Sequence, residues 1–197
     1  PLLEQMGADL YFNPTFSVPA VKTVRFQVSI IHDVVFEERP HWVEPGLRSY
    51  LSRWSRFAAA EADHVVTVSD DARRRIRKVY GVEDKRITRI HNGVSPAAFE
   101  APTAKAIADV RRKYRLDGPY VLNLGAIEPK KGVAELIEVF PRLGFPGPLV
   151  LAGGQGGPAI DLPRVPFVRA LVYIPEEDKK PLLQGATLFV YPSRYEG

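Results

Sequence analysis

Two adjacent lysines, Lys130 and Lys131, stand where a strand is expected to give way to a helix. The apolar run 120–124 is typical of a short strand, and the apolar residues of 133–140 recur with helical spacing. Cations at a helix N-terminus are unfavourable by about 0.3–1 kcal/mol, unless an anion lies between them and the free backbone amides. The pattern therefore indicates a phosphate site. On these residues alone, the alternative is a solvated pair of lysines balanced by Glu128.

A second candidate lies nearer the start of the chain, where His32 and Asp33 follow the apolar run 24–31. Open α/β sheets bind their ligands at the carboxyl ends of the strands, and a polar pair directly after a buried strand fits that position. Without further information, an ordinary polar loop explains this pair better than a ligand site does.

The elements that would carry these residues alternate along the chain. Strand patterns occur at 8–12, 24–31, 64–68, 86–90, 120–124, 149–152, 168–173 and 187–191, and helix patterns at 47–58, 70–80, 107–114, 133–140 and 176–184. Strands that alternate with helices of this length pair in parallel and build a doubly wound α/β sheet. The Pro- and Ala-rich segment 95–104 is predicted to be a linker and 37–45 to be a loop.

Composition restricts the class of protein. Of the 197 residues, 45% are hydrophobic and 25% are charged, as in soluble globular proteins, and no apolar run approaches the ~20 residues of a membrane-spanning helix. The absence of cysteine excludes disulfides, thiol catalysis and Cys-ligated zinc. We expect a cytoplasmic protein, although the lack of cysteine fits any compartment. No Asp-x-Asp pair or histidine cluster of ligand spacing occurs, so no metal site is predicted.

The chain is basic, with a formal charge of +4, and its cations gather at 73–78, 85–86 and 111–115. Such clusters bind nucleic acid, anionic lipid or phosphate-bearing substrates. For 73–78, a solvated helix face is also a sufficient explanation, with Ser69 as the N-cap and Gly81 at the helix end. Neither an aromatic-interleaved basic strand nor a zinc-finger spacing is present, so nucleic-acid binding is not expected.

The order of the motifs resembles that of retaining family-4 glycosyltransferases of the GT-B type: IHDVVF at 31–36, LGAIEPKKGVAELIEVF at 124–140, LVLAGG at 149–154 and ATLFVYPSRYEG at 186–197. The resemblance covers nearly the whole chain. It implies an α/β protein with two Rossmann-like doubly wound domains facing a cleft, here 1–96 and 97–197, and a nucleotide-sugar donor held mainly by the second.

The resemblance also implies an activity. A hexose such as mannose or glucose would pass from a nucleotide-diphospho-sugar to a glycan, lipid or small-molecule acceptor, with retention at the anomeric carbon and without a metal ion or other cofactor. A lipid-linked acceptor would bring peripheral association with the inner face of a membrane. Two other classes remain open: a non-catalytic nucleotide- or sugar-binding module of the same fold, and a polyanion- or membrane-surface-binding protein that uses the basic clusters.

Residue by residue, the resemblance implies a donor site after the strand 120–124. Lys131 matches the lysine that binds the donor diphosphate, Lys130 assists beside it, and Gly125 lets the backbone turn close to the phosphates. Many relatives carry an arginine directly after that glycine, where this chain has Ala126, so the resemblance implies that one cation suffices here.

Two catalytic positions are implied as well. His32 and Glu196 match residues near the transferred sugar, and Asn92 and Gly93 match a turn at the domain crossover. The first strands of the N-terminal domain and the second glutamate of the family's motif are not found in this sequence. We therefore expect both domains to be incomplete and the chain to be an internal portion of a longer enzyme, inactive by itself.

Overall fold

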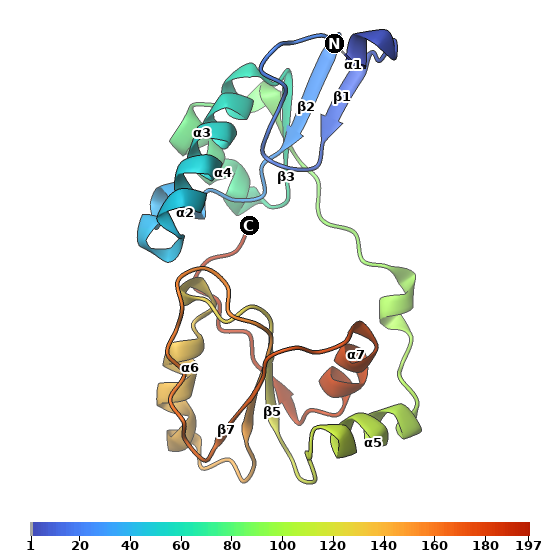
Figure 1. Cartoon of the computed structure of the whole chain (residues 1–197), viewed down its shortest axis with the longest axis vertical. Helices are drawn as coiled ribbons and strands as arrows, with labels where there is room; N and C mark the ends of the chain where they lie inside the picture. Colours follow the sequence, from blue (N-terminus) through green and yellow to red (C-terminus); the bar gives the residue numbers. More distant parts are fainter. Residues whose placement is uncertain (1) are drawn as a thin grey trace. The chain divides into compact units, whose positions relative to one another are not determined.

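The computed structural model describes residues 2–197, which form two compact α/β units (Figure 1). The first unit extends to Gly93 and also takes in Glu196 and Gly197, and the second is Val94–Tyr195. The chain thus passes from one unit to the other next to the segment that the sequence predicts to be a linker. That segment contains the short 3-10 helix η3 (Pro96–Phe99) before the helix α5 (Ala104–Lys113) begins.

The first unit is built on a parallel sheet in the order β1-β2-β3-β4. Its strands are β1 (Leu10–Asn13), β2 (Phe26–Ile30), β3 (His64–Thr67) and β4 (Ile87–Arg89); its helices are α1 (Leu2–Gln5), α2 (Val35–Glu38), η1 (Pro40–Trp42), α3 (Pro45–Glu61), α4 (Asp70–Tyr80) and η2 (Asp84–Arg86). Because the strands follow one another in sequence order, right-handed crossovers place α3 and α4 on one face of the sheet. The core beneath them includes Ile31, Val34, Val65 and Ile76.

The helix α4 begins and ends where its sequence predicts. The Ser69 hydroxyl accepts a hydrogen bond from the backbone N–H of Ala72 at 2.9 Å, and Gly81 ends the helix in the left-handed region with φ of 70°. The arginines of this helix have carboxylate partners within the unit: Arg73 with Asp84, Arg77 with Asp84, Arg74 with Asp71, and Arg75 with Asp71 and Glu38.

The segment 37–45, predicted to be a loop, is partly helical and contains the end of α2 and all of η1. Helices of a single turn are too short for hydrophobic periodicity to reveal them. The start of α2 is supported by Asp33, whose carboxylate accepts a hydrogen bond from the Val35 N–H at 3.1 Å. Val35 and Phe36 then bury their side chains.

The second unit has a parallel sheet in the order β7-β6-β5-β8, so the strand order reverses at β5. Its strands are β5 (Val121–Leu124), β6 (Leu149–Ala152), β7 (Val168–Leu171) and β8 (Leu188–Phe189), and besides η3 and α5 its helices are η4 (Pro129–Lys131), α6 (Val133–Val139), η5 (Phe140–Leu143) and α7 (Glu176–Gln184). The junction of the paired strands β5 and β8 is therefore a topological switch point, and doubly wound sheets bind their ligands at the carboxyl ends of such strands.

The two faces of this sheet pack against different helices, because successive side chains of a strand point to opposite faces. Leu122 and Val150 pack with α5 and α7, whereas Val121 and Leu151 pack with α6. Figure 1 shows α6 on one side of β5 and α5 and α7 on the other. This two-sided covering confirms the predicted doubly wound architecture of the unit.

A buried carboxylate joins α7 to α5. Asp178, 7% exposed, accepts hydrogen bonds from the Lys113 ammonium at 2.5 Å and from the Tyr114 hydroxyl at 2.6 Å. Burial opposes ionisation of the Asp178 carboxyl, but the two hydrogen bonds outweigh it and hold the pKa of Asp178 below its usual value. The ionised carboxylate therefore helps to fix α7 against the sheet.

Candidate functional site

The two strands that flank the switch point are tied together at their carboxyl ends. The backbone N–H of Val190 donates to the Leu122 carbonyl at 2.8 Å, and the buried Asn123 side chain donates to the Val190 carbonyl at 2.8 Å. The segments that leave β5 and β8 consequently run beside each other. These two segments carry Gly125, Lys130 and Lys131 on one side and Tyr191 on the other.

The lysine pair does not occupy the first turn of a long helix, as the sequence suggested. Lys130 and Lys131 lie in the 3-10 turn η4, and Gly132, with φ of 66°, separates them from α6. Because Gly132 adopts a left-handed conformation, α6 begins only after it and does not include the lysines. The helix-dipole argument therefore does not apply to them. The case for a phosphate site rests instead on where the Lys131 side chain lies.

Lys131 is buried, with 9% of its surface exposed, and its ammonium lies 4.9 Å from the centre of the Tyr191 ring. An ammonium loses much of its hydration when it is buried, and the negative face of an aromatic ring offsets part of that cost. The contact joins the residue that follows β5 to the residue that follows β8. A positive charge is thereby held at the switch point.

Glycines permit this close approach of backbones. A Cβ atom on Gly132 would lie 2.4 Å from the Pro192 carbonyl oxygen, and one on Gly125, with φ of 154°, would lie 3.1 Å from the Tyr191 ring. The chain bends at Gly125, where φ is positive. That this bend is a tight turn near phosphates stays a prediction.

Lys130 has a different environment from Lys131. Its ammonium lies 3.8 Å from a Glu128 carboxylate oxygen, the partner that the alternative reading of the lysine pair named. Its carbonyl accepts a hydrogen bond from the Arg194 N–H at 2.8 Å, and the Arg194 guanidinium pairs with Glu135 at 2.6 Å. These contacts fasten the segment after β8 to the turn that holds both lysines.

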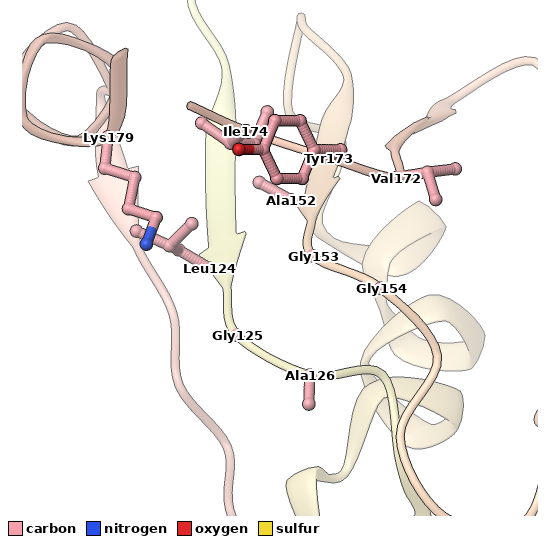
Figure 2. A pocket seen from close by; sticks show the side chains of 10 residues that line it. All are labelled: Leu124, Gly125, Ala126, Ala152, Gly153, Gly154, Val172, Tyr173, Ile174 and Lys179. Carbon is pink, nitrogen blue, oxygen red and sulfur yellow. The ribbon is translucent and has the colours of Figure 1, made fainter. Parts of the chain in front are cut away.

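A pocket of about 400 Å³ opens at the carboxyl ends of the strands of this unit (Figure 2). It is lined by Leu124, Gly125, Ala126, Ala152, Gly153, Gly154, Val172, Tyr173, Ile174 and Lys179. In Figure 2 two backbone segments, at Gly125 and at Gly153, form one side of it, and the Lys179 side chain reaches toward it from α7. The Tyr173 ring is 79% exposed, so its face is accessible to a ligand.

No helix follows the glycine run 153–157, as the prolines after it predict. The loop is instead ordered by Gln155, whose side-chain amide donates to the Ile160 carbonyl at 2.9 Å and accepts from the Ile160 N–H at 3.3 Å. Gly153 has φ of 146°, and a Cβ there would lie 2.0 Å from the Gly125 carbonyl oxygen. The glycines thus allow the loops after β5 and β6 to meet at the pocket.

The structure places the remaining predicted residues in the first unit. His32 is exposed at the carboxyl end of β2, and its Nε2 lies 3.2 Å from the Pro14 carbonyl oxygen, which requires a proton on that nitrogen. Asn92 and Gly93 are exposed beyond β4, and Glu196 is exposed and groups with the first unit. The structure therefore brings Gly125, Lys130 and Lys131 together, while His32 and Glu196 belong to the other unit.

Sequence reasoning missed Tyr191, Tyr173 and Lys179. Tyr191 was assigned to the last strand, and its position at the carboxyl end of that strand was a usable signal. Its contact with Lys131 depends on the pairing of β5 with β8, which a single sequence does not encode in any local pattern. The same holds for Tyr173 and Lys179, which line one pocket from the loop after β7 and from α7.

Within residues 2–197, no group of three or more His, Cys, Asp or Glu side chains is arranged to hold a metal ion. In the same range, none of the helices combines the length and the apolar character that crossing a bilayer requires.

Comparison with known proteins gives a family-model match for part of the chain and a shared fold. Residues 8–98 match the model of Glycosyltransferase Family 4. Over 200 residues the chain is 28% identical to the O-antigen chain mannosyltransferase B of Escherichia coli, a match that covers 95% of this chain and 52% of that protein. This chain therefore spans about half the length of that relative.

Two solved structures share the fold. WaaG, a glycosyltransferase involved in lipopolysaccharide biosynthesis, is similar with a TM-score of 0.70 and 17% identity, over 98% of this chain and 55% of that one. The Anabaena protein HepE, solved in complex with UDP and glucose, is similar with a TM-score of 0.68 and 16% identity, again over 98% and 55%. The likeness confirms the predicted fold class, a pair of Rossmann-like α/β units.

Proposed function

The chain resembles GT-B glycosyltransferases, as its sequence predicts, and from this premise we propose that the protein transfers a hexose from a nucleoside-diphosphate donor to an acceptor. The proposed transfer retains the anomeric configuration and needs no metal ion. The similarity to a mannosyltransferase of O-antigen chains favours mannose as the hexose and a glycan, free or lipid-linked, as the acceptor.

The observation that carries the proposal is the buried ammonium of Lys131 at the switch point between β5 and β8. Doubly wound sheets bind anionic ligands at this place, and a fixed ammonium forms charge-assisted hydrogen bonds with phosphate oxygens. Gly125 and Gly132 allow the segment after β8 to pack closely against the turn that holds Lys131. Lys130 is proposed to assist from the same turn.

The pocket that Gly125 helps to line suits the nucleoside part of the donor. Its volume of about 400 Å³ lies in the usual range for small-molecule sites, about 300–1,000 Å³. The Tyr173 ring supplies a face on which a base can stack, and the backbone at Gly153 and Gly154 supplies polar groups for its edge. The base itself is left open.

In the proposed reaction, the bond between the anomeric carbon and the diphosphate oxygen breaks, and the acceptor oxygen bonds to the face that the diphosphate leaves. The acceptor proton passes to the departing phosphate, so no protein nucleophile is needed. Lys131 stabilises the negative charge that grows on the leaving group. His32 and Glu196 are proposed to lie beside the transferred sugar, with the Glu196 carboxylate accepting hydrogen bonds from its hydroxyls.

The basic clusters give less support to a polyanion-binding protein. The arginines of α4 are paired with carboxylates, and in the second unit Arg111 donates to the carbonyl oxygens of Gly185 and Gly118 at 3.0 and 2.6 Å. Cations that are engaged in this way contribute less to a free basic surface. An affinity that depends on the identity of the nucleotide base would favour the glycosyltransferase, because polyanion binding does not depend on the base.

The test is calorimetric titration of the protein with UDP, GDP and ADP, and with the matching nucleosides, in the presence of EDTA. We expect one diphosphate to bind, and Lys131→Ala to weaken it roughly ten- to a hundredfold, because a charge-assisted contact is lost. The affinity for the nucleoside should not change, since it carries no phosphate. Lys130→Ala should have a smaller effect on the diphosphate.

Lys105→Ala is the matched control, because Lys105 is a highly exposed lysine of the same unit, paired with Asp109 on α5. If Lys131→Ala leaves diphosphate affinity at the level of this control, the phosphate site is wrong. If the full-length protein binds a nucleotide sugar and neither transfers nor hydrolyses the sugar, the non-catalytic binding module is the correct function. An inverted product, detected by NMR of the new glycosidic bond, would contradict retention.

A further inference from the structure

We infer that Tyr191 is a positioning residue for Lys131: its ring holds the lysine ammonium at the switch point, ready to meet the donor diphosphate. This inference rests on the proposed function, since it assigns a task to the cation of that same site. It adds a residue that does not itself touch the phosphates and that acts through the lysine.

Three contacts fix the Tyr191 ring. It stacks on Phe189 with the ring centres 6.0 Å apart and the planes 20° apart, and it packs against the backbone of Gly125. Its other contact is with the Lys131 ammonium, 4.9 Å from the ring centre. In the closed sheet, the ring is thus supported by Phe189 of β8 and by the turn after β5, and the lysine ammonium lies against it.

A lysine needs such support more than an arginine would. Its ammonium is a point charge at the end of a flexible four-carbon stem, and each rotamer that is populated away from the phosphates lowers the affinity for them. The ring attracts the ammonium through its quadrupole, and the attraction grows when the lysine is buried, as Lys131 is.

The ring carries no net charge. It can therefore restrain the ammonium without itself offsetting the positive charge that an incoming phosphate needs. With 42% of its surface exposed, Tyr191 is also more open than a residue needed only to fill a core.

A double-mutant cycle tests the inference. Tyr191→Leu keeps an apolar side chain and removes the ring, Tyr191→Phe keeps the ring and removes the hydroxyl, and Lys131→Met removes the charge. The readout is the affinity of the full chain for the diphosphate that binds and for its nucleoside. We expect Tyr191→Leu to weaken diphosphate binding about 5- to 30-fold and Tyr191→Phe to change it by less than about threefold.

In the Lys131→Met background, Tyr191→Leu should have no further effect on diphosphate affinity, because the ring then has no ammonium to hold. The nucleoside affinity should stay the same in all variants, which also shows that they are folded. If Tyr191 had a purely structural role, Tyr191→Leu would instead weaken the binding of the diphosphate and of the nucleoside together. Equal losses from Tyr191→Leu with and without Lys131 would overturn the inference.

A spectroscopic readout accompanies the cycle and does not depend on the leucine variant folding. Protons on the Lys131 ε-carbon that lie over a ring face resonate upfield, so a ring-current shift is expected in the wild type and in Tyr191→Phe. Its absence from the wild type would overturn the inference. If Lys131→Met leaves diphosphate affinity unchanged, both the phosphate site and the inference fail; if Lys131→Met weakens binding and Tyr191→Leu does not, only the inference fails.

Discussion

At the scale of single residues, the site depends on glycines that let two backbones meet. Gly132 combines a left-handed backbone, φ of 66°, with the Pro192 carbonyl oxygen 2.4 Å from where a Cβ would stand. Gly144 has a similar φ of 58° and open space around it. The two positions therefore share the backbone requirement and differ only in the close approach.

This pair separates two energetic costs. We expect Gly144→Ala to lower the free energy of unfolding by about 1 kcal/mol, the penalty for a left-handed alanine. Gly132→Ala should lower the free energy of unfolding by at least about 1–2 kcal/mol more, because the alanine methyl group would overlap with the Pro192 carbonyl oxygen. Urea denaturation of both variants measures the difference. Equal losses would mean that the segment after β8 can move away from Gly132 at little cost.

At the scale of elements, the attachment of α7 to α5 depends on the ionised Asp178. The folded-state pKa of this carboxyl lies below that of the unfolded chain, so its contribution to stability is present above the unfolded value of about 3.9 and is lost as the pH falls through the folded value. Because Lys113 is half exposed, the contribution should be modest.

We predict that Asp178→Asn lowers the free energy of unfolding by about 1–2 kcal/mol near neutral pH. The deficit should shrink as the pH falls below about 4, since the wild-type carboxyl then loses its charge as well. Chemical denaturation along a pH series measures it, and Asp117→Asn, at an exposed position of the same unit, is the control. A deficit that does not change with pH would assign Asp178 a role independent of its charge.

Elements were predicted better than their arrangement. The cap at Ser69, the end at Gly81 and the buried stripe of α6 follow from local periodicity and capping, and the structure confirms them. The turn η4 was not predicted, because a single turn is too short to show hydrophobic periodicity and Gly132 separates it from α6. The strand order β7-β6-β5-β8 was not predicted either, because strand order depends on packing between segments far apart in the chain. Hence Lys131 could be named as a candidate from the sequence, whereas its neighbour Tyr191 could not.

At the scale of the whole molecule, the sheet of the first unit presents apolar side chains to solvent. Leu10, Phe12 and Phe26 are 53%, 52% and 47% exposed, and the register of β1 with β2 places them on one face. In the part of the chain that the structure describes, β1 also has a strand partner on one side only. An apolar face next to an unpaired strand edge favours self-association.

We therefore predict that the chain of residues 1–197 binds an apolar dye and forms oligomers at micromolar concentration. Replacing Leu10, Phe12 and Phe26 together by threonine should reduce both, as measured by dye fluorescence and sedimentation. Phe99→Thr is the control, because Phe99 is 80% exposed but stands alone on η3. A monomeric wild type with little dye binding would show that this face does not drive association.

The strand that leads into Tyr191 is the shortest of those that the structure describes. β8 has two residues, Leu188 and Phe189, which are 53% and 44% exposed, and it closes one side of the described sheet. Such an edge can detach in a local opening that costs far less than global unfolding. Each opening would carry Tyr191 away from Lys131 and abolish the site while β5, β6 and β7 stay folded. A bound diphosphate would close this equilibrium, so ligand binding should slow backbone hydrogen exchange most at Val190, in a segment that the ligand itself need not touch.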